Sequence, residues 1–514
     1  MSGNKCPIVA IYNVTSKGME NRLREKLKDF GLLFYEEDHA VLYQKRTHVY
    51  ITFHPTEEST YFGSLCKLPP EKRRRWIHYK KEAHITANSI WSCFLCSSIG
   101  FSEEKSSDGR TVPECLRIRT DIVPLDPHYF DEAPLVSVFT TTFRSKEKIL
   151  RVVKSMLRQT YVNWELVILD DSNDDGVTFG GVLNSLPKDP RIRRYFPGEA
   201  SGYIGEVKRY ACGLCKGKLL FEMDHDDELE PDCVRRIVHA FQENPDAGFV
   251  YGDGAEILEK KLTSHEYGEG YGLGYGSYYH QFSVMIQRWC KVARSIDLNN
   301  STLVDIIGVP NHPRVWRTDF YHAIGGHNVD LSVADDYELL LRTFLRTKMV
   351  RVPTLMYLQY RNEGGNNFTF LRNDLIRRLQ GRIGWHYRSV IEEKIKAMSL
   401  PLQRNDKQTP IWTFPESSPY WRHGNRTAYS DGITKIVLIR KGKVADVLPK
   451  LKEKEYAVVL AYGSHDITKE MEEWKLTPED ALKIRWWKLK TEDREDALRY
   501  AKMLIETAEI EVIG

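Results

Sequence analysis

The chain has 514 residues, of which 41% are hydrophobic and 11% aromatic, and its 74 basic and 71 acidic residues leave a net charge of +3. At about 150 residues per domain this length predicts about three domains, and the composition excludes a disordered chain. The small net charge gives no global field that would favour a nucleic acid as partner. The sequence shows neither a secretory leader nor an apolar run long enough to cross a bilayer, and its nine cysteines are spread as reduced thiols would be. We therefore expect a soluble, cytoplasmic protein.

Residues 1–130 are expected to form a small accessory α/β domain. It opens with the strand-like segment PIVAIYN and continues with a charged helical stretch from Lys17 to Phe30. Further along, the segment from Glu71 to Lys81 interleaves four consecutive basic residues with Trp76 and Tyr79. This segment is either a solvated helix face or a peripheral contact with an anionic membrane surface or an acidic substrate.

The pattern becomes sharper in residues 131–400, where apolar strands alternate with amphipathic helices. Segments that read as strands include Leu135 to Phe139, Trp164 to Leu169 and Leu219 to Phe221. This alternation predicts an α/β domain with a mostly parallel sheet flanked by helices, whose ligands bind beyond the carboxyl ends of the strands. Asp171 follows one of these strand ends.

Three carboxylates directly follow the strand at Leu219 to Phe221. Asp224 and Asp226 are two residues apart, so in an extended chain their side chains face the same way. Two hard oxygen ligands on one side favour Mg²⁺ or Mn²⁺, which leave coordination sites for water and for the phosphates of a nucleotide diphosphate. The alternative is an acidic loop that caps the strand and binds nothing.

Two further segments bear on an acceptor. Asp335 and Asp336 open an amphipathic helix, although acidic residues in a first turn often do no more than interact with the helix dipole. The segment YGEGYGLGYGSYY is rich in glycine and predicts a mobile loop, in which Tyr271 and Tyr275 offer flat faces and hydroxyls to a sugar acceptor. The alternative is a surface insertion whose rings pack on the sheet. We place His312 on the same acceptor side.

The remainder of the chain contributes no recognisable chemistry. Residues 401–430 are dominated by Pro, Gln, Ser and Asn and predict a linker. Residues 431–514 alternate strands and helices again, which predicts a C-terminal small α/β domain.

Four segments, taken in order over roughly Pro134 to Asn367, resemble those of family 2 glycosyltransferases of GT-A fold: PLVSVFTTTFRSKEKILRVVKSMLRQTYVNWELVILDDSNDD, GEVKRYACGLCKGKLLFEMDHDDELEPD, FVYGD and IGGHNVDLSVADDYELLLR. The resemblance implies a GT-A domain and assigns roles to individual residues. It places the nucleotide at Thr140, Thr141, Phe143, Asp171 and Asp224, the metal of the DxD motif at Asp224 and Asp226, and the catalytic base at Asp336, with Asp335 standing where Glu is common. Phe143 and Arg144 depart from the usual Tyr and Asn. The chain lacks the QxxRW motif of processive synthases, so the resemblance is to members that add single sugars.

These residues also make chemical sense together. A metal at the two carboxylates would neutralise the charge of a departing nucleotide diphosphate, and Lys208 is either a further diphosphate contact or a surface residue. Asp336 would take the proton of an acceptor hydroxyl, and such a one-step displacement inverts the anomeric carbon. We therefore predict an inverting glycosyltransferase that uses Mn²⁺ or Mg²⁺, a nucleotide-sugar donor, with a UDP-sugar expected, and a glycan or glycoconjugate acceptor. The alternatives are a metal-dependent phosphohydrolase and a non-catalytic carbohydrate-binding protein.

Overall fold

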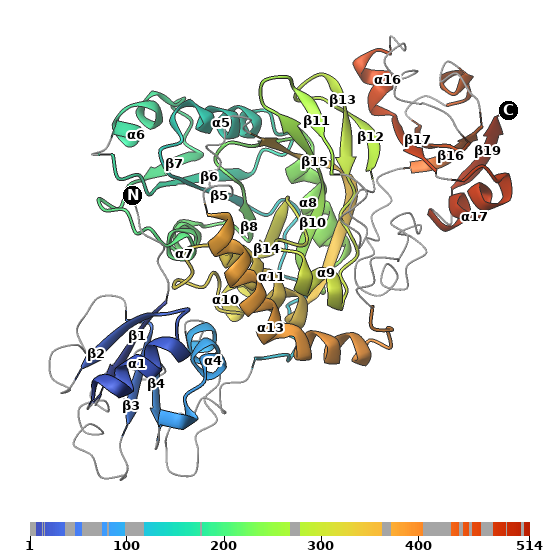
Figure 1. Cartoon of the computed structure of the whole chain (residues 1–514). Coiled ribbons are helices and arrows are strands. Elements are labelled where there is room, and N and C mark those ends of the chain that lie inside the picture. The colour runs from blue at the N-terminus through green and yellow to red at the C-terminus, as the bar shows by residue number, and fades with distance from the viewer. Residues whose placement is uncertain are drawn as a thin grey trace.

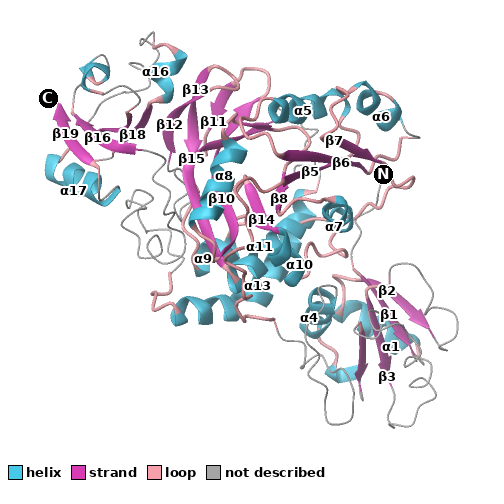
Figure 2. Cartoon of the chain, turned by 180° about the vertical axis from the view of Figure 1, so that it is seen from behind, coloured by secondary structure: helices cyan, strands magenta, loops and turns pink. Residues whose placement is uncertain are grey.

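Figure 1 and Figure 2 show the computed structural model of the whole chain. The structure describes residues 7–12, 14, 16–35, 47–53, 75–79, 82–97, 118–174, 177–267, 278–361, 372–403, 433–440, 446–451, 455–463, 476–489, 491–504 and 508–513. Most of the predicted linker, from residue 404 to 430, lies outside these residues.

The N-terminal part forms a sheet of four parallel strands in the order β2-β1-β3-β4 (Figure 1). Its elements are β1 (Ile8–Tyr12), α1 (Lys17–Lys26), β2 (Gly31–Tyr35), β3 (Val49–Phe53), β4 (Trp76–Tyr79) and α4 (Ala87–Ser97). The charged stretch predicted to be helical is α1, which begins where the Ser16 side chain accepts a hydrogen bond from the Met19 N–H.

The basic segment predicted as a helix face differs from expectation. Its residues Trp76–Tyr79 are the strand β4, because Ile77 is buried in the core of this small unit. Of the remaining residues from 71 to 81, only Arg75 lies in the described part of the chain, so the expected membrane contact stays a prediction.

The central part is a sheet in which the order β7-β6-β5-β8-β14-β10 is followed by β15 alongside β10. The strands are β5 (Val136–Thr142), β6 (Trp164–Asp170), β7 (Ile192–Tyr195), β8 (Leu219–Glu222), β10 (Ala247–Leu258), β14 (Arg314–Arg317) and β15 (Lys348–Arg361). Every residue of β6 and β8 is buried, as expected for strands covered on both faces. β14 runs antiparallel to both of its neighbours, β8 and β10.

Helices cover both faces of this sheet. On one face α5 (Ile149–Leu157) and α8 (Cys233–Glu243) share a hydrophobic core with the strands. On the other face α7 (Ile204–Leu214), α11 (Asp335–Arg346) and α13 (Asn373–Ala397) do the same. The shorter helices are α6 (Val177–Gly180), α9 (Asn300–Asp305) and α10 (Thr318–Ala323).

A hairpin joins this sheet to the C-terminal unit. The hairpin strands are β12 (Tyr278–Ser283) and β13 (Arg288–Ala293), and the short strands β9 (Glu228–Leu229) and β11 (Thr263–His265) lie against β15 and β10. The C-terminal elements are β16 (Ile433–Ile439), β17 (Tyr456–Ala461), α16 (Pro478–Leu482), β18 (Ile484–Lys488), α17 (Arg494–Leu504) and β19 (Glu509–Ile513). β18 pairs antiparallel with β12, and the rings of Tyr279 and Trp487 lie 4.6 Å apart, so the C-terminal sheet continues the central one (Figure 2).

The predicted α/β fold class is confirmed: a domain with a mostly parallel sheet flanked by helices, and smaller α/β units at both ends. The boundaries at residues 130, 400 and 430 stay a prediction. Among the described residues, no helix combines the length and the apolar character needed to cross a membrane.

Candidate active site

The candidate residues gather at one edge of the central sheet. β5, β6 and β8 are parallel, so their carboxyl ends meet there, with Thr142 opposite Asp170 and Phe139 opposite Glu222. The reversed strand β14 begins at the same edge, where Arg314 lies opposite Glu222. Because β14 runs antiparallel to β8, the guanidinium of its first residue, Arg314, lies beside the carboxyl end of β8.

Close packing brings the starts of α7 and α11 to this edge. The Gly205 N–H donates to the carbonyl of Leu331, and a Cβ atom at Gly205 would lie only 1.9 Å from the carbonyl oxygen of Asn328. Only glycine permits this approach. As a result, Lys208 on α7 and Asp335 on α11 lie side by side.

The carboxylates of the DxD motif are accessible because a third carboxylate anchors their loop. The side chains of Asp224 and Asp226 are 41% and 24% exposed. Asp227 is buried and accepts hydrogen bonds from the Tyr357 hydroxyl, at 2.8 Å, and the Tyr360 N–H, also at 2.8 Å. Burial, followed by the charges of Asp226 and Asp224, raises the pKa of Asp227. Asp227 is not among the site residues predicted from the sequence, although three aspartates within four residues gave a signal.

The donor set of the DxD motif fits a hard divalent cation. Both carboxylates are open to solvent, and the Nε2 atom of His312 lies 3.6 Å from the nearer oxygen of Asp224. Within the described ranges, no three His, Cys, Asp or Glu side chains are already grouped as a metal site. Asp226 instead lies 3.7 Å from the Lys148 ammonium. A cation here would take two protein carboxylates and complete its coordination with phosphate and water oxygens.

The predicted base, Asp336, lies at the start of α11 with its side chain 28% exposed. Its Oδ2 atom accepts from Nη1 of Arg314 at 2.7 Å and its Oδ1 atom from the Tyr337 N–H at 2.7 Å. Burial acts to raise the pKa of Asp336, but the Arg314 guanidinium and the Lys208 ammonium outweigh it and hold that pKa below its ordinary value. The carboxylate is therefore ionised, fixed in orientation and open to a ligand.

Its neighbour Asp335 differs in environment. The side chain of Asp335 is only 3% exposed and lies 3.5 Å from the Lys208 ammonium and 3.7 Å from Nε2 of His327. Burial and the charges of Asp336 and Glu222 raise the pKa of Asp335 against the attraction of Lys208. Asp335, predicted on the acceptor side, is therefore the less accessible carboxylate of the two.

Lys208 lies inside an acidic cluster. Its ammonium donates to Glu222 at the end of β8 and is nearly buried. Burial acts to lower the pKa of Lys208, but Asp335 and Glu222 outweigh it and raise that pKa. In turn, Lys208 and Arg314 overcome the effect of burial on Glu222 and lower its pKa to about 2. The side chain predicted to contact a diphosphate thus ties α7 to β8 and α11.

The residues predicted to hold the nucleotide have different exposures. Asp171 is nearly buried and accepts from the backbone N–H groups of Ser201, at 2.7 Å, and Gly202, at 3.3 Å, while burial raises the pKa of Asp171. Thr140 is fully buried within β5, Thr141 is half-buried and Phe143 is 41% exposed.

Two of the residues predicted on the acceptor side, Asp335 and His312, lie in the described part of the chain. The His312 ring is buried and stacks on Tyr357 at 4.8 Å, and its Nε2 atom lies 3.6 Å from an oxygen of Asp224. Burial, followed by the charge of Arg314, lowers the pKa of His312. Tyr271 and Tyr275 lie outside the described residues, so the proposed loop stays a prediction.

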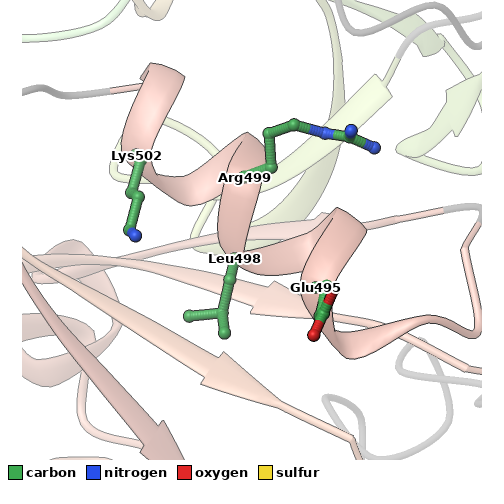
Figure 3. A pocket seen from close by; sticks show the side chains of 4 residues that line it. All are labelled: Glu495, Leu498, Arg499 and Lys502. Carbon is green, nitrogen blue, oxygen red and sulfur yellow. The ribbon is translucent and has the colours of Figure 1, made fainter.

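A pocket elsewhere in the molecule contains none of these residues. Figure 3 shows it on α17 of the C-terminal unit, lined by Glu495, Leu498, Arg499 and Lys502. Its lining is one face of a surface helix. The open carboxylates at the edge of the central sheet are the stronger candidate, because they combine charge, accessibility and fixed geometry.

Comparison with known proteins identifies the central region. The family model described as Glycosyl transferase family 2 matches residues 137–295. The chain carries a family 2 glycosyltransferase domain. The match includes Asp171 and the DxD motif and ends before Arg314 and Asp336, so the predicted base lies beyond the matched residues.

Curated relatives show the same likeness over part of their length. The chain is 32% identical over 135 residues to a chondroitin synthase of Escherichia coli, covering 26% of this chain and 19% of that protein. It is 24% identical over 223 residues to a hyaluronan synthase of Pasteurella multocida, covering 43% of this chain and 20% of that protein. The matched stretch thus spans about a fifth of the length of these relatives.

Solved structures are more distant. TarS 1-349 of S. aureus in complex with UDP-GlcNAc has 14% sequence identity and a TM-score of 0.36, and the match covers 50% of this chain and 70% of that one. The mannosyltransferase PcManGT of Pyrobaculum calidifontis, in complex with GDP-Man and Mn²⁺, has 14% identity and a TM-score of 0.33, covering 54% of this chain and 77% of that one.

Proposed function

We propose that this chain transfers a sugar from a nucleotide-diphosphate donor to an acceptor hydroxyl of a glycan or glycoconjugate, with inversion at the anomeric carbon. One observation supports this most strongly. The two open carboxylates after β8 and the ionised, cation-held carboxylate of Asp336 belong to the same sheet edge. The family 2 glycosyltransferase domain covers the first two of these carboxylates.

The donor would bind with its diphosphate near Asp224 and Asp226 and its nucleoside near Asp171 and the end of β5, where Thr140, Thr141 and Phe143 lie. Mn²⁺ or Mg²⁺ held by the two DxD carboxylates would neutralise the charge that develops on the departing diphosphate. Lys208 contributes indirectly, because its ammonium is engaged by Glu222 and Asp335. A UDP-sugar is the expected donor.

The acceptor would react on the side of Asp336. Its oxygen forms a bond to the anomeric carbon, and the bond from that carbon to the diphosphate oxygen breaks, leaving its electron pair on the nucleoside diphosphate. The acceptor proton moves to a carboxylate oxygen of Asp336. Holding this carboxylate by two hydrogen bonds fixes where that oxygen lies, which is the contribution that a general base needs from its protein.

The test is a panel of nucleotide-sugars that includes UDP-N-acetylglucosamine and GDP-mannose, incubated with the chain and Mn²⁺ while release of nucleoside diphosphate is measured. We expect turnover of at least one donor, loss of that turnover in EDTA, and loss in Asp226→Ala. Asp246→Ala is the matched control, because its side chain is 67% exposed and pairs with Lys348. Full turnover in EDTA would contradict the proposal.

Two other outcomes identify the alternatives. Release of inorganic phosphate instead of nucleoside diphosphate would indicate a phosphohydrolase. Binding of the donor with no turnover under any metal would indicate a carbohydrate-binding protein that does no chemistry.

A further inference from the structure

Arg314 is the first residue of β14 and its side chain is 4% exposed. The strand pairing places it opposite Glu222, and its Nη1 atom lies 3.9 Å from Oε2 of that carboxylate. An arginine buried in this way is costly unless its donors are used. The acceptors of its hydrogen bonds therefore indicate which groups the Arg314 guanidinium stabilises.

The loop before β14 fixes the orientation of the guanidinium. Nε donates to the carbonyl of Pro310 at 3.0 Å, and Nη2 donates to the carbonyl of Gly308 at 2.9 Å. Gly308 has a φ of +74°, and a Cβ atom there would lie 3.0 Å from Nη2. The loop therefore has a glycine at the position where a side chain would crowd the Arg314 guanidinium.

The remaining nitrogen, Nη1, donates to Asp336 at 2.7 Å. A carboxylate offers about four lone-pair sites, and Arg314 and the Tyr337 N–H occupy two of them, one on each oxygen. The side chain is still 28% exposed, so the other sites can meet a ligand. The arginine restricts the carboxylate without covering it.

We infer that Arg314 is a positioning residue for the proposed reaction, which fixes the orientation of the Asp336 carboxylate. The inference rests on the proposed function. Other charged groups also interact with this carboxylate: Lys208 from α7, Asp335 from α11 itself and His327 from the preceding loop. Glu222 from β8 interacts with Arg314 and Asp335. Arg314 differs from them because it makes a direct hydrogen bond to Asp336 and is held by backbone carbonyls on its other side.

A different role for Arg314 would be to bind the donor diphosphate. The geometry argues against it, since Nε, Nη1 and Nη2 each already have an acceptor and the side chain is nearly buried. The two roles predict different kinetics. A positioning residue acts on kcat through Asp336, whereas a diphosphate ligand acts on the KM of the donor.

The experiment is a double-mutant cycle on the full chain, using Arg314→Lys, Asp336→Asn and the two together. The substrate is the nucleotide-sugar of the panel above that turns over fastest. Lysine keeps the positive charge but cannot reach three acceptors, so we expect kcat to fall about tenfold or more, with the donor KM changed by less than about twofold. In the Asp336→Asn background, the same substitution should cost less than about twofold.

Arg317→Lys is the matched control, because Arg317 is buried in the same strand but pairs with Asp319 at 2.7 Å. It should leave kcat unchanged in the folded enzyme. Arg314→Gln adds a second readout: without the cation the pKa of Asp336 rises, so the acid limb of the kcat profile should move to higher pH.

The result that would overturn the inference is a loss of kcat that is equally large with and without Asp336. A raised donor KM with unchanged kcat would overturn it as well and would assign Arg314 to donor binding. Absence of turnover in the unsubstituted chain is a different failure, because it overturns the proposed function.

Discussion

Helix α11 carries two carboxylates that pair with buried arginines, and the pairs differ in how completely the carboxylate is enclosed. Glu338 is 0% exposed and accepts from Nε of Arg342 at 2.7 Å, from Nη2 at 2.6 Å and from the Tyr387 hydroxyl at 2.5 Å. Arg342 also donates to the carbonyls of Ile324 and Gly326. Asp336, two residues earlier in the same first turn, has one bond to its arginine and remains 28% exposed.

The difference separates a structural pair from a reactive one. Enclosing Glu338 satisfies its oxygens and joins α11 to α13, on which Tyr387 lies, so this pair specifies packing. Asp336 makes fewer hydrogen bonds than Glu338, so it contributes less to packing, but its carboxylate oxygens can meet a ligand. The same chemical groups, two residues apart in one turn of α11, thus serve packing at Glu338 and, as we propose, catalysis at Asp336.

The largest expected effect is that of Asp336→Asn on the reaction rate. The amide keeps the shape of the side chain but cannot take a proton, so kcat should fall by about 10²- to 10⁴-fold while the donor still binds. Steady-state kinetics together with titration calorimetry of the donor would measure both. Comparable losses of rate and of donor affinity would show that Asp336 is structural, and the contrast with Glu338 would disappear.

The second effect is on stability and concerns the enclosed pair. Glu338→Gln leaves the Arg342 charge buried without its counter-charge, which should reduce the free energy of unfolding by about 3–5 kcal/mol. Urea denaturation would report the loss, and Asp336→Asn provides the comparison, with a smaller expected loss because Asp336 is 28% exposed and the Arg314 guanidinium keeps a second carboxylate, Glu222, 3.9 Å away. If the two substitutions destabilise the chain equally, enclosure does not distinguish the pairs.

A third carboxylate, Glu230, is buried and accepts hydrogen bonds from neutral groups rather than from an arginine. It accepts from the Ser283 hydroxyl and from the Val284 N–H at 2.9 Å, and burial raises its pKa to about 7. Because this pKa lies above the ordinary value of about 4.3, the folded state holds the proton more tightly than the unfolded chain. Its contribution to stability is therefore complete below about pH 4.3 and is lost as the pH rises through 7.

Glu230→Gln removes this titration and should flatten the dependence of stability on pH between about 4.3 and 7. Thermal unfolding at several pH values would measure it. An unchanged pH dependence would show that the environment of Glu230 is more polar than its burial indicates.

The sequence predicted those parts of the site that local pattern determines. The strand that ends before Asp224, the paired carboxylates of the DxD motif and the acidic start of α11 all follow from apolar runs and residue spacing. Arg314 escaped notice because its significance depends on β14 running against β8, a pairing between distant segments. Tyr357, which holds Asp227 from 130 residues away, escaped for the same reason.

The contacts between the N-terminal, central and C-terminal units could not be predicted from the sequence either. Arg75 of the N-terminal unit lies 2.8 Å from Asp330, in the loop that leads to α11, although 255 residues separate the two in the chain. The pairing of β18 with β12 likewise joins segments that the sequence assigned to separate domains. Periodicity gives the type of each element, while the partner of a strand or an ion depends on the assembled fold.

The most direct test of the account follows the anomeric configuration of the released sugar by proton NMR as the unsubstituted chain, with Mn²⁺, turns over its fastest nucleotide-sugar. We expect the sugar to appear first with the configuration opposite to that of the donor, together with nucleoside diphosphate, and Asp336→Asn to slow this release. A sugar that first appears with the configuration of the donor would contradict a single displacement assisted by Asp336.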